Sequence, residues 1–128
     1  MTKCVVRSMV TDGSGSRIVN IASIVASTGY SGLSVHASSK ASLVGSTRPL
    51  AREPGPPGIT VNAVAPGFID TEMTRDMRDI QRGQITRRSA LQRPPEIRDV
   101  ASTVEFLLSD KAKDITGTVL TVDAGNTV

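Results

Sequence analysis

Short apolar runs rich in β-branched residues alternate along this chain with longer stretches whose apolar residues recur every three or four positions. The runs RIVNIAS (17–23), ITVNAVA (59–65) and TVLTVDA (118–124) have the length and composition of buried strands. Helical spacing over about 35–53 predicts a helix between the first two strands, and the same spacing over about 95–109 predicts another before the third. This alternation is typical of an α/β protein with a parallel sheet.

The helix predicted at about 95–109 has the clearer amphipathic pattern. Its apolar face consists of Ile97, Val100, Ala101, Val104, Leu107 and Leu108. Pro95 suits a first turn, and Glu96 and Asp99 place negative charge at the positive end of the helix dipole. The sequence therefore predicts that this helix begins near Pro95.

Glycine and proline mark where the predicted elements stop or are interrupted. The segments TDGSGS (11–16) and EPGPPG (53–58) have the composition of turns, and each precedes a predicted strand. The glycines of the first segment do not indicate a phosphate-binding loop, because such a loop follows a strand and opens a helix. Within the helix at 35–53, Pro49 removes a hydrogen bond to Gly45 at a cost of roughly 3 kcal/mol, and a kink at Gly45 would accommodate it.

Composition narrows the classes of function. The 128 residues suffice for one domain with a single core. A net charge of +3 spread along the chain, with two Phe, one Tyr and no Trp to stack on bases, argues against a nucleic-acid partner. The single cysteine, Cys4, excludes an internal disulfide, and one cysteine with one histidine cannot supply a structural zinc site. The apolar stretch at 1–10 is interrupted by Arg7 and is too short for a signal peptide or a bilayer span, so we expect a cytoplasmic protein with no membrane partner.

Five segments, in this order and at this spacing, resemble the short-chain dehydrogenase/reductase family, and within it the bacterial-type 3-oxoacyl-acyl-carrier-protein reductases. They are SRIVNIASIVASTGYSG, ASSKASLVGSTRPLARE, GITVNAVAPGFIDTEMT, DVASTVEFLLSD and ITGTVLTVDAG. Any one of them alone would be weak, but five in register are specific.

The resemblance implies an α/β fold that corresponds to the C-terminal half of a Rossmann-like doubly wound parallel sheet, with about three strands and flanking helices. The family's Gly-rich cofactor loop, its first four strands and its catalytic asparagine would all precede residue 1. We therefore expect residues 1–128 to form a single incomplete Rossmann-like reductase domain that lacks the N-terminal dinucleotide-binding half. Its strands should pair in parallel through right-handed crossovers and leave one side of the strand at 17–23 uncovered, which would favour self-association.

The resemblance also assigns catalytic positions. Ser23 matches the family serine that hydrogen-bonds the substrate carbonyl, and Lys40 matches the lysine of the Tyr-x-x-x-Lys motif, one helical turn after residue 36. His36 stands where the family has its proton-donating tyrosine. An imidazole reaches less far than a phenol but can act through a water molecule, so either His36 or Tyr30, the only phenol in the chain, remains a candidate for the missing acid.

A second group of positions matches the family's cofactor loop. In the segment APGFIDTEMT, Pro66 and Gly67 would line the nicotinamide, the Ile69 backbone would meet its carboxamide, and Thr71 would reach the pyrophosphate. The segment follows the carboxyl end of a predicted strand, where open α/β sheets bind ligands. Near the C-terminus, Ala124 replaces the first glycine of the family's usual Gly-Gly pair.

These matches imply an oxidoreductase that uses NADP or NAD to reduce 3-oxoacyl thioesters or related carbonyls, as in fatty acid biosynthesis. The change at His36 and the absent Gly-rich loop predict impaired activity and weak cofactor binding. The alternative is a non-catalytic remnant or assembly subunit of a reductase. Because the family's counterpart of the helix at 35–53 packs against another subunit, a homo-oligomer is expected in either case.

Overall fold

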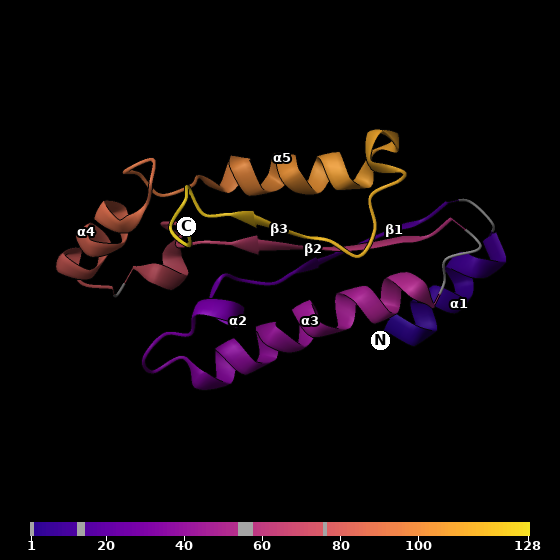
Figure 1. Ribbon diagram of the computed structural model, residues 1–128, viewed down its shortest axis with the longest axis horizontal. Helices are drawn as coiled ribbons and strands as arrows, with labels where there is room; N and C mark the ends of the chain where they lie inside the picture. Colours follow the sequence, from indigo (N-terminus) through magenta and orange to yellow (C-terminus); the bar gives the residue numbers. More distant parts are fainter. Residues whose placement is uncertain (1, 13–14, 54–57, 76) are drawn as a thin grey trace.

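The computed structural model describes residues 2–12, 15–53, 58–75 and 77–128 (Figure 1). Parts of both predicted turns, 13–14 and 54–57, lie outside the described residues. The elements in chain order are α1 (Thr2–Asp12), β1 (Arg17–Ile21), α2 (Val25–Thr28), α3 (Ser34–Arg52), β2 (Thr60–Pro66), the 3-10 helix η1 (Glu72–Thr74), α4 (Asp79–Arg88), α5 (Ile97–Leu108), the 3-10 helix η2 (Asp110–Ala112) and β3 (Val119–Val122).

The three strands form one parallel sheet in the order β1-β2-β3, as the alternating pattern predicts. In the register of β1 and β2, Arg17 lies opposite Thr60 and Ile21 opposite Val64. The central strand β2 is buried along all but its last residue, which is why it appears in the sequence as a mostly apolar run. The buried side-chain amide of Asn62 donates to the Ile115 carbonyl at 2.8 Å and accepts the Thr118 amide at 3.2 Å.

Helices cover both faces of the sheet, so the expected doubly wound α/β architecture is confirmed. Side chains of β2 alternate between two cores: Ala63 and Ala65 pack with Val44 of α3, whereas Val64 packs with Leu107 of α5. Figure 1 shows α3 and α5 on opposite sides of the strands.

The two crossover connections have opposite hands. Both move in the same direction across the sheet, from β1 to β2 and from β2 to β3, while α3 and α5 cover opposite faces. About 98% of such connections are right-handed, so one of these two is of the rare kind and the expectation that both are right-handed is wrong. The physical reason is packing, because α3 already covers one face of β2 and the apolar face of α5 covers the other.

The two long helices lie where the sequence predicts them, with small differences at their ends. The helix α3 runs through Pro49 to Arg52, and the Glu53 amide donates to the Pro49 carbonyl at 3.1 Å. Helix α5 begins two residues after Pro95, which lies outside the first turn. At its start the Glu96 amide donates to the Asp99 carboxylate at 2.9 Å, so the acidic first turn caps the helix directly.

Helix α4 has no counterpart among the predicted elements. Its sequence, DIQRGQITRR, is largely polar and contains a glycine, and none of its residues is buried. A helix without an apolar face leaves no periodic signal for a sequence to reveal.

Candidate functional site

The carboxyl ends of the three strands bring the predicted site segments to one edge of the sheet. The Ile24 amide, just after β1, donates to the Pro66 carbonyl at 3.0 Å, and the Gly67 amide, just after β2, donates to the Val122 carbonyl at 2.9 Å. The segments that leave β1, β2 and β3 therefore start side by side, at the edge where parallel sheets place ligands.

Lys40 reaches this edge from helix α3. Its Nζ donates to the carbonyl of Ile21, the last residue of β1, at 2.9 Å. Ser23 follows two residues later and is half-buried, and its Oγ accepts the Val25 amide at 3.4 Å. The structure thus places the hydroxyl of Ser23 and the ammonium group of Lys40 at the end of the same strand.

His36 and Tyr30 lie at the entrance to α3. His36 is exposed in the first turn of the helix, one turn before Lys40, and its carbonyl accepts the Ser39 hydroxyl at 2.7 Å. Tyr30, between α2 and α3, is 45% exposed. Within the described part of the chain, neither the imidazole nor the phenol has a hydrogen-bond partner. Neither ring is therefore hydrogen-bonded to Ser23 or Lys40 in the described structure.

The loop after β2 passes closely over the end of β3. A Cβ on Gly67 would lie 2.7 Å from the Cβ and 2.8 Å from the Cα of Asp123, so only glycine fits at this position. Beyond it, the hydroxyl of Thr74 donates to the Ile69 carbonyl at 3.1 Å and accepts the Thr71 amide at 2.9 Å. Ile69 and Thr71 are therefore held by one side chain of the short helix η1.

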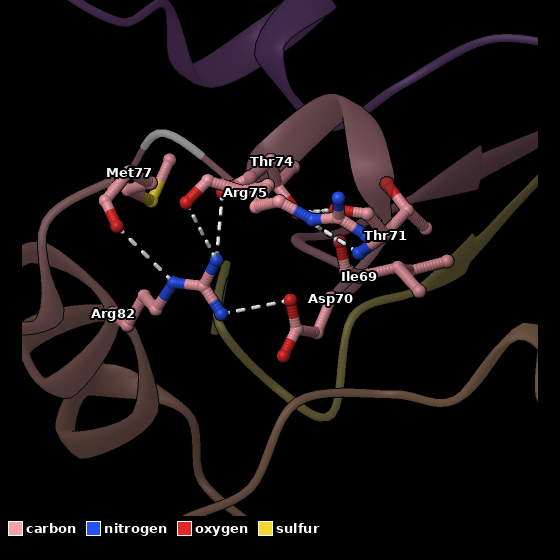
Figure 2. Close-up of polar contacts among 7 residues, drawn as sticks. All are labelled: Ile69, Asp70, Thr71, Thr74, Arg75, Met77 and Arg82. Atoms are coloured by element: carbon pink, nitrogen blue, oxygen red, sulfur yellow. Dashed lines mark hydrogen bonds and ion pairs between the residues drawn. The ribbon is translucent and has the colours of Figure 1, made fainter.

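Arg82 of α4 ties the same loop from the other side, as Figure 2 shows. Its Nη1 lies 2.7 Å from the Asp70 carboxylate, its Nη2 donates to the Thr74 carbonyl at 2.8 Å, and its Nε donates to the Met77 carbonyl at 3.2 Å. Arg82 is not among the site residues predicted from the sequence. It is twelve positions from Asp70 in a helix without an apolar stripe, so no local pattern marks it.

The donors left at this edge suit an oxygen-rich ligand. Among the hydrogen bonds of the described residues, the hydroxyls of Ser23 and Thr71 donate to no partner, and the ammonium of Lys40 uses only one of its three N–H groups. Hydroxyl and ammonium donors fit a carbonyl oxygen, ribose hydroxyls and a phosphate, which are the groups of a dinucleotide and a carbonyl substrate. By contrast, the described residues contain no cluster of three or more His, Cys, Asp or Glu that would hold a metal ion.

Comparison with known proteins identifies the family. A family model described as enoyl-(acyl carrier protein) reductase matches residues 1–127. The 3-oxoacyl-[acyl-carrier-protein] reductase FabG of Pseudomonas aeruginosa is 45% identical over 125 residues, which are 98% of this chain and 50% of that protein. The chain belongs to the short-chain dehydrogenase/reductase family. The resemblance drawn from the five sequence segments is thereby confirmed.

Other relatives agree in identity and in extent. The FabG proteins of Salmonella typhimurium and Escherichia coli are 44% and 43% identical over 125 residues, and the match covers 98% of this chain and 51% of each. The chain thus spans about half the length of the curated relatives it matches. No helix in the described residues combines the length and the apolar character needed to cross a bilayer.

Proposed function

We propose that this chain carries the substrate-carbonyl and nicotinamide side of an NAD(P)-dependent reductase site. The observation that supports it most is the hydrogen bond from Lys40 to the Ile21 carbonyl, because it brings the family's lysine position to the strand end that carries Ser23. The loop of Pro66, Gly67, Ile69 and Thr71 leaves the neighbouring strand at the same edge.

The substrate we propose is a 3-oxoacyl thioester or a related carbonyl compound. The description of the family model and the names of the relatives both refer to acyl groups on a carrier protein, but they differ in the bond reduced, C=C in the first and C=O in the second. The relatives' names favour the carbonyl, and so does Ser23, whose hydroxyl is a hydrogen-bond donor suited to a polarised oxygen. Such a substrate belongs to fatty acid biosynthesis, which we place in the cytoplasm.

Each matched residue then has a role defined by its chemistry. The reduced cofactor, NADPH or NADH, would supply the hydride to the carbonyl carbon when bound. Ser23 holds the carbonyl oxygen by donating its hydroxyl proton in a hydrogen bond, and Lys40 donates to the ribose hydroxyls of the nicotinamide half.

The proton that the carbonyl oxygen takes up has two candidate donors in this chain. His36 stands one helical turn from Lys40 and would act through a water molecule, because it is exposed and its ring makes no hydrogen bond to Ser23 or Lys40 in the described structure. Tyr30 lies in the loop that precedes α3, between two glycines with positive φ at Gly29 and Gly32. Since neither ring is in place for direct transfer, we propose that reduction by this chain is impaired.

Titration of the purified chain with NADPH, followed by cofactor fluorescence, tests the proposal. The matched residues address only the nicotinamide half of the cofactor, so we expect a dissociation constant of about 1 mM, or roughly −4 kcal/mol. Lys40→Met should weaken binding about tenfold or more, since a hydrogen bond to a charged group contributes about 1.5–3 kcal/mol. Lys111→Met is the matched control, because Lys111 is exposed in η2 and bonds to none of the site residues.

Each outcome of this titration either supports or contradicts the proposed function. Absence of saturable binding, or equal binding by the Lys40→Met variant, contradicts the proposed function. Micromolar binding supports it and shows that the chain holds the cofactor through more contacts than the matched positions provide.

The exposed ring of His36 favours a second candidate, a non-catalytic subunit that assembles with copies of itself or with a reductase. In the described residues β1 pairs only with β2, and Ile21 on it is 45% exposed, so an unpaired strand edge is available. Sedimentation velocity at several protein concentrations tests this association. We expect a dimer or larger species, and a monomer that persists at high concentration would exclude assembly of this chain with copies of itself.

A further inference from the structure

Arg82 binds the loop after β2 through an ion pair with Asp70 and hydrogen bonds to backbone carbonyls. We infer that Arg82 is a positioning residue, which holds this loop in the conformation that receives the nicotinamide half of the cofactor. This inference rests on the proposed function of the loop. It adds a residue outside the segment that the family's motif identifies.

The guanidinium group of Arg82 donates to three backbone carbonyls at and just after the end of η1. The 3-10 helix η1 has only three residues, and the last carbonyls of a helix have no partner within it. Arg82 donates to the Thr74 carbonyl at 2.8 Å, which also accepts the Met77 amide at 3.1 Å. It also donates to the carbonyls of Arg75 at 3.4 Å and Met77 at 3.2 Å. A rigid planar fork can serve several acceptors in fixed directions, which a flexible lysine cannot do.

Thr74 carries the effect of Arg82 to the proposed cofactor contacts. Its carbonyl accepts from Arg82, while its hydroxyl donates to the Ile69 carbonyl at 3.1 Å and accepts the Thr71 amide at 2.9 Å. A shift of Thr74 would therefore move both residues. Figure 2 shows Arg82 on one side of Thr74, and Ile69 and Thr71 on the other.

Arg82 also balances a charge that would oppose an anionic ligand. Asp70 lies between Ile69 and Thr71, its side chain is 63% exposed, and an unpaired carboxylate there would repel a phosphate at Thr71. The 2.7 Å ion pair with Arg82 offsets that repulsion. The inference thus predicts one effect on loop order and a second on binding of a phosphate-bearing ligand.

Amide hydrogen exchange, measured by NMR, tests the effect on loop order. In the Arg82→Ala variant the amides of Thr71 and Thr74 should exchange about tenfold or more faster, because several charge-assisted hydrogen bonds are lost. Arg82→Lys should fall between wild type and Arg82→Ala. Arg75→Ala is the matched control, since Arg75 belongs to the same loop but is 74% exposed and pairs only with Glu72, and it should change these rates less than about twofold.

Titration with reduced nicotinamide mononucleotide tests the effect on the ligand. We expect the dissociation constant to rise about tenfold or more in Arg82→Ala and to stay unchanged in Arg75→Ala. Adding Asp70→Asn to Arg82→Ala should restore part of the affinity without restoring slow exchange, because it removes the repulsion and not the disorder. A role confined to general stability would not produce this split.

Two results of the exchange experiment would overturn the inference. One is unchanged exchange at Thr71 and Thr74 in Arg82→Ala, and the other is faster exchange throughout the chain, which would show general destabilisation. Unaltered affinity in Arg82→Ala, when the wild-type chain binds the mononucleotide, refutes the role of Arg82 alone. If the wild-type chain does not bind it, the proposed function fails, and the role of Arg82 in cofactor binding fails with it.

Discussion

One arginine holds the chain at the amino ends of the strands and another holds it at the carboxyl ends. The two differ in burial and in the segments that they bind. At the amino ends of the strands Arg17 is only 12% exposed, and its Nη1 donates to the carbonyls of Gly15, Ser16 and Gly58, so it joins the segments that enter β1 and β2. At the carboxyl ends Arg82 is 25% exposed and holds a single loop from outside the sheet. The first joins the two segments that lead into neighbouring strands, and the second holds one loop after β2.

The two ends of the strands also differ in the polar groups that lie there. At the amino ends, Arg17 of β1 lies opposite Thr60 of β2. The Nε of Arg17 and the hydroxyl of Thr60 are buried with no protein partner in the described residues. At the carboxyl ends, the hydroxyls of Ser23 and Thr71 and two N–H groups of Lys40 have no acceptor in the described residues, and these three residues are half-buried. Parallel sheets bind ligands at the carboxyl ends of their strands. Contacts at the amino ends can therefore stabilise the fold, while groups at the carboxyl ends remain available to a ligand.

The largest effect that this comparison predicts is on Arg17. Arg17→Ala would remove a mostly buried side chain and its hydrogen bonds to three backbone carbonyls, of which that of Ser16 still accepts the Thr60 amide at 3.1 Å. We therefore expect the free energy of unfolding to fall by about 2–4 kcal/mol. Arg82→Ala should lower it by only about 1 kcal/mol, because its loop is at the periphery. Urea denaturation followed by circular dichroism measures both. A greater loss in Arg82→Ala would reverse the assignment of the two edges.

The second effect concerns the close contact at the carboxyl edge. Gly67→Ala would drive a Cβ into Asp123, which is 7% exposed and cannot easily move, because its carboxylate accepts the amides of Gly125 and Thr127 at 2.9 Å each. We expect the free energy of unfolding to fall by about 1–3 kcal/mol. Gly45→Ala is the matched control, since Gly45 lies within α3 with open space around it, and alanine there should stabilise by about 0.5–1 kcal/mol. Equal shifts of the thermal midpoint in the two variants would contradict the contact.

Several parts of this architecture follow from local sequence patterns, and the remainder depends on packing across the fold. The strand β2 and the helix α5 could be predicted because their burial leaves a mostly apolar run or a helical stripe. The face of the sheet that α5 covers could not, because its stripe is the same on either face. For that reason the parallel pairing was predicted correctly, while one crossover hand was wrong.

In the candidate site, too, some contacts follow from local sequence and others depend on how distant segments pack. The spacing of His36 and Lys40 on one helical face is local, and so is the turn that brings Thr71 close to Thr74. The reach of Lys40 to Ile21 and of Arg82 to Asp70 depends on how α3 and α4 lie against the strand ends. Only the family's motif pointed to Lys40, and nothing in the sequence pointed to Arg82.

A smaller effect is predicted at the end of β3, where Ala124 has φ +56°. Alanine pays about 1 kcal/mol in this left-handed region and glycine does not, so Ala124→Gly should raise the free energy of unfolding by about 0.5–1 kcal/mol. Ala101→Gly is the control of opposite sign, because Ala101 is exposed inside α5, where glycine should cost about 1 kcal/mol. If both variants are destabilised in urea, the backbone at Ala124 is not strained.

The smallest effect is predicted for His36, which is exposed in the first turn of α3 and whose ring makes no hydrogen bond in the described structure. His36→Ala should change the free energy of unfolding by less than about 0.5 kcal/mol, as expected for an exposed residue. It should also leave the rate of 3-oxoacyl thioester reduction within about threefold of wild type, whereas removal of a general acid typically costs about a hundredfold or more. Ser23→Ala is the matched variant at the same edge, and we expect it to lower that rate about a hundredfold, because it removes the donor proposed to hold the carbonyl oxygen. A hundredfold loss in His36→Ala would show that the imidazole donates the proton after all, and that this edge rearranges when substrate binds.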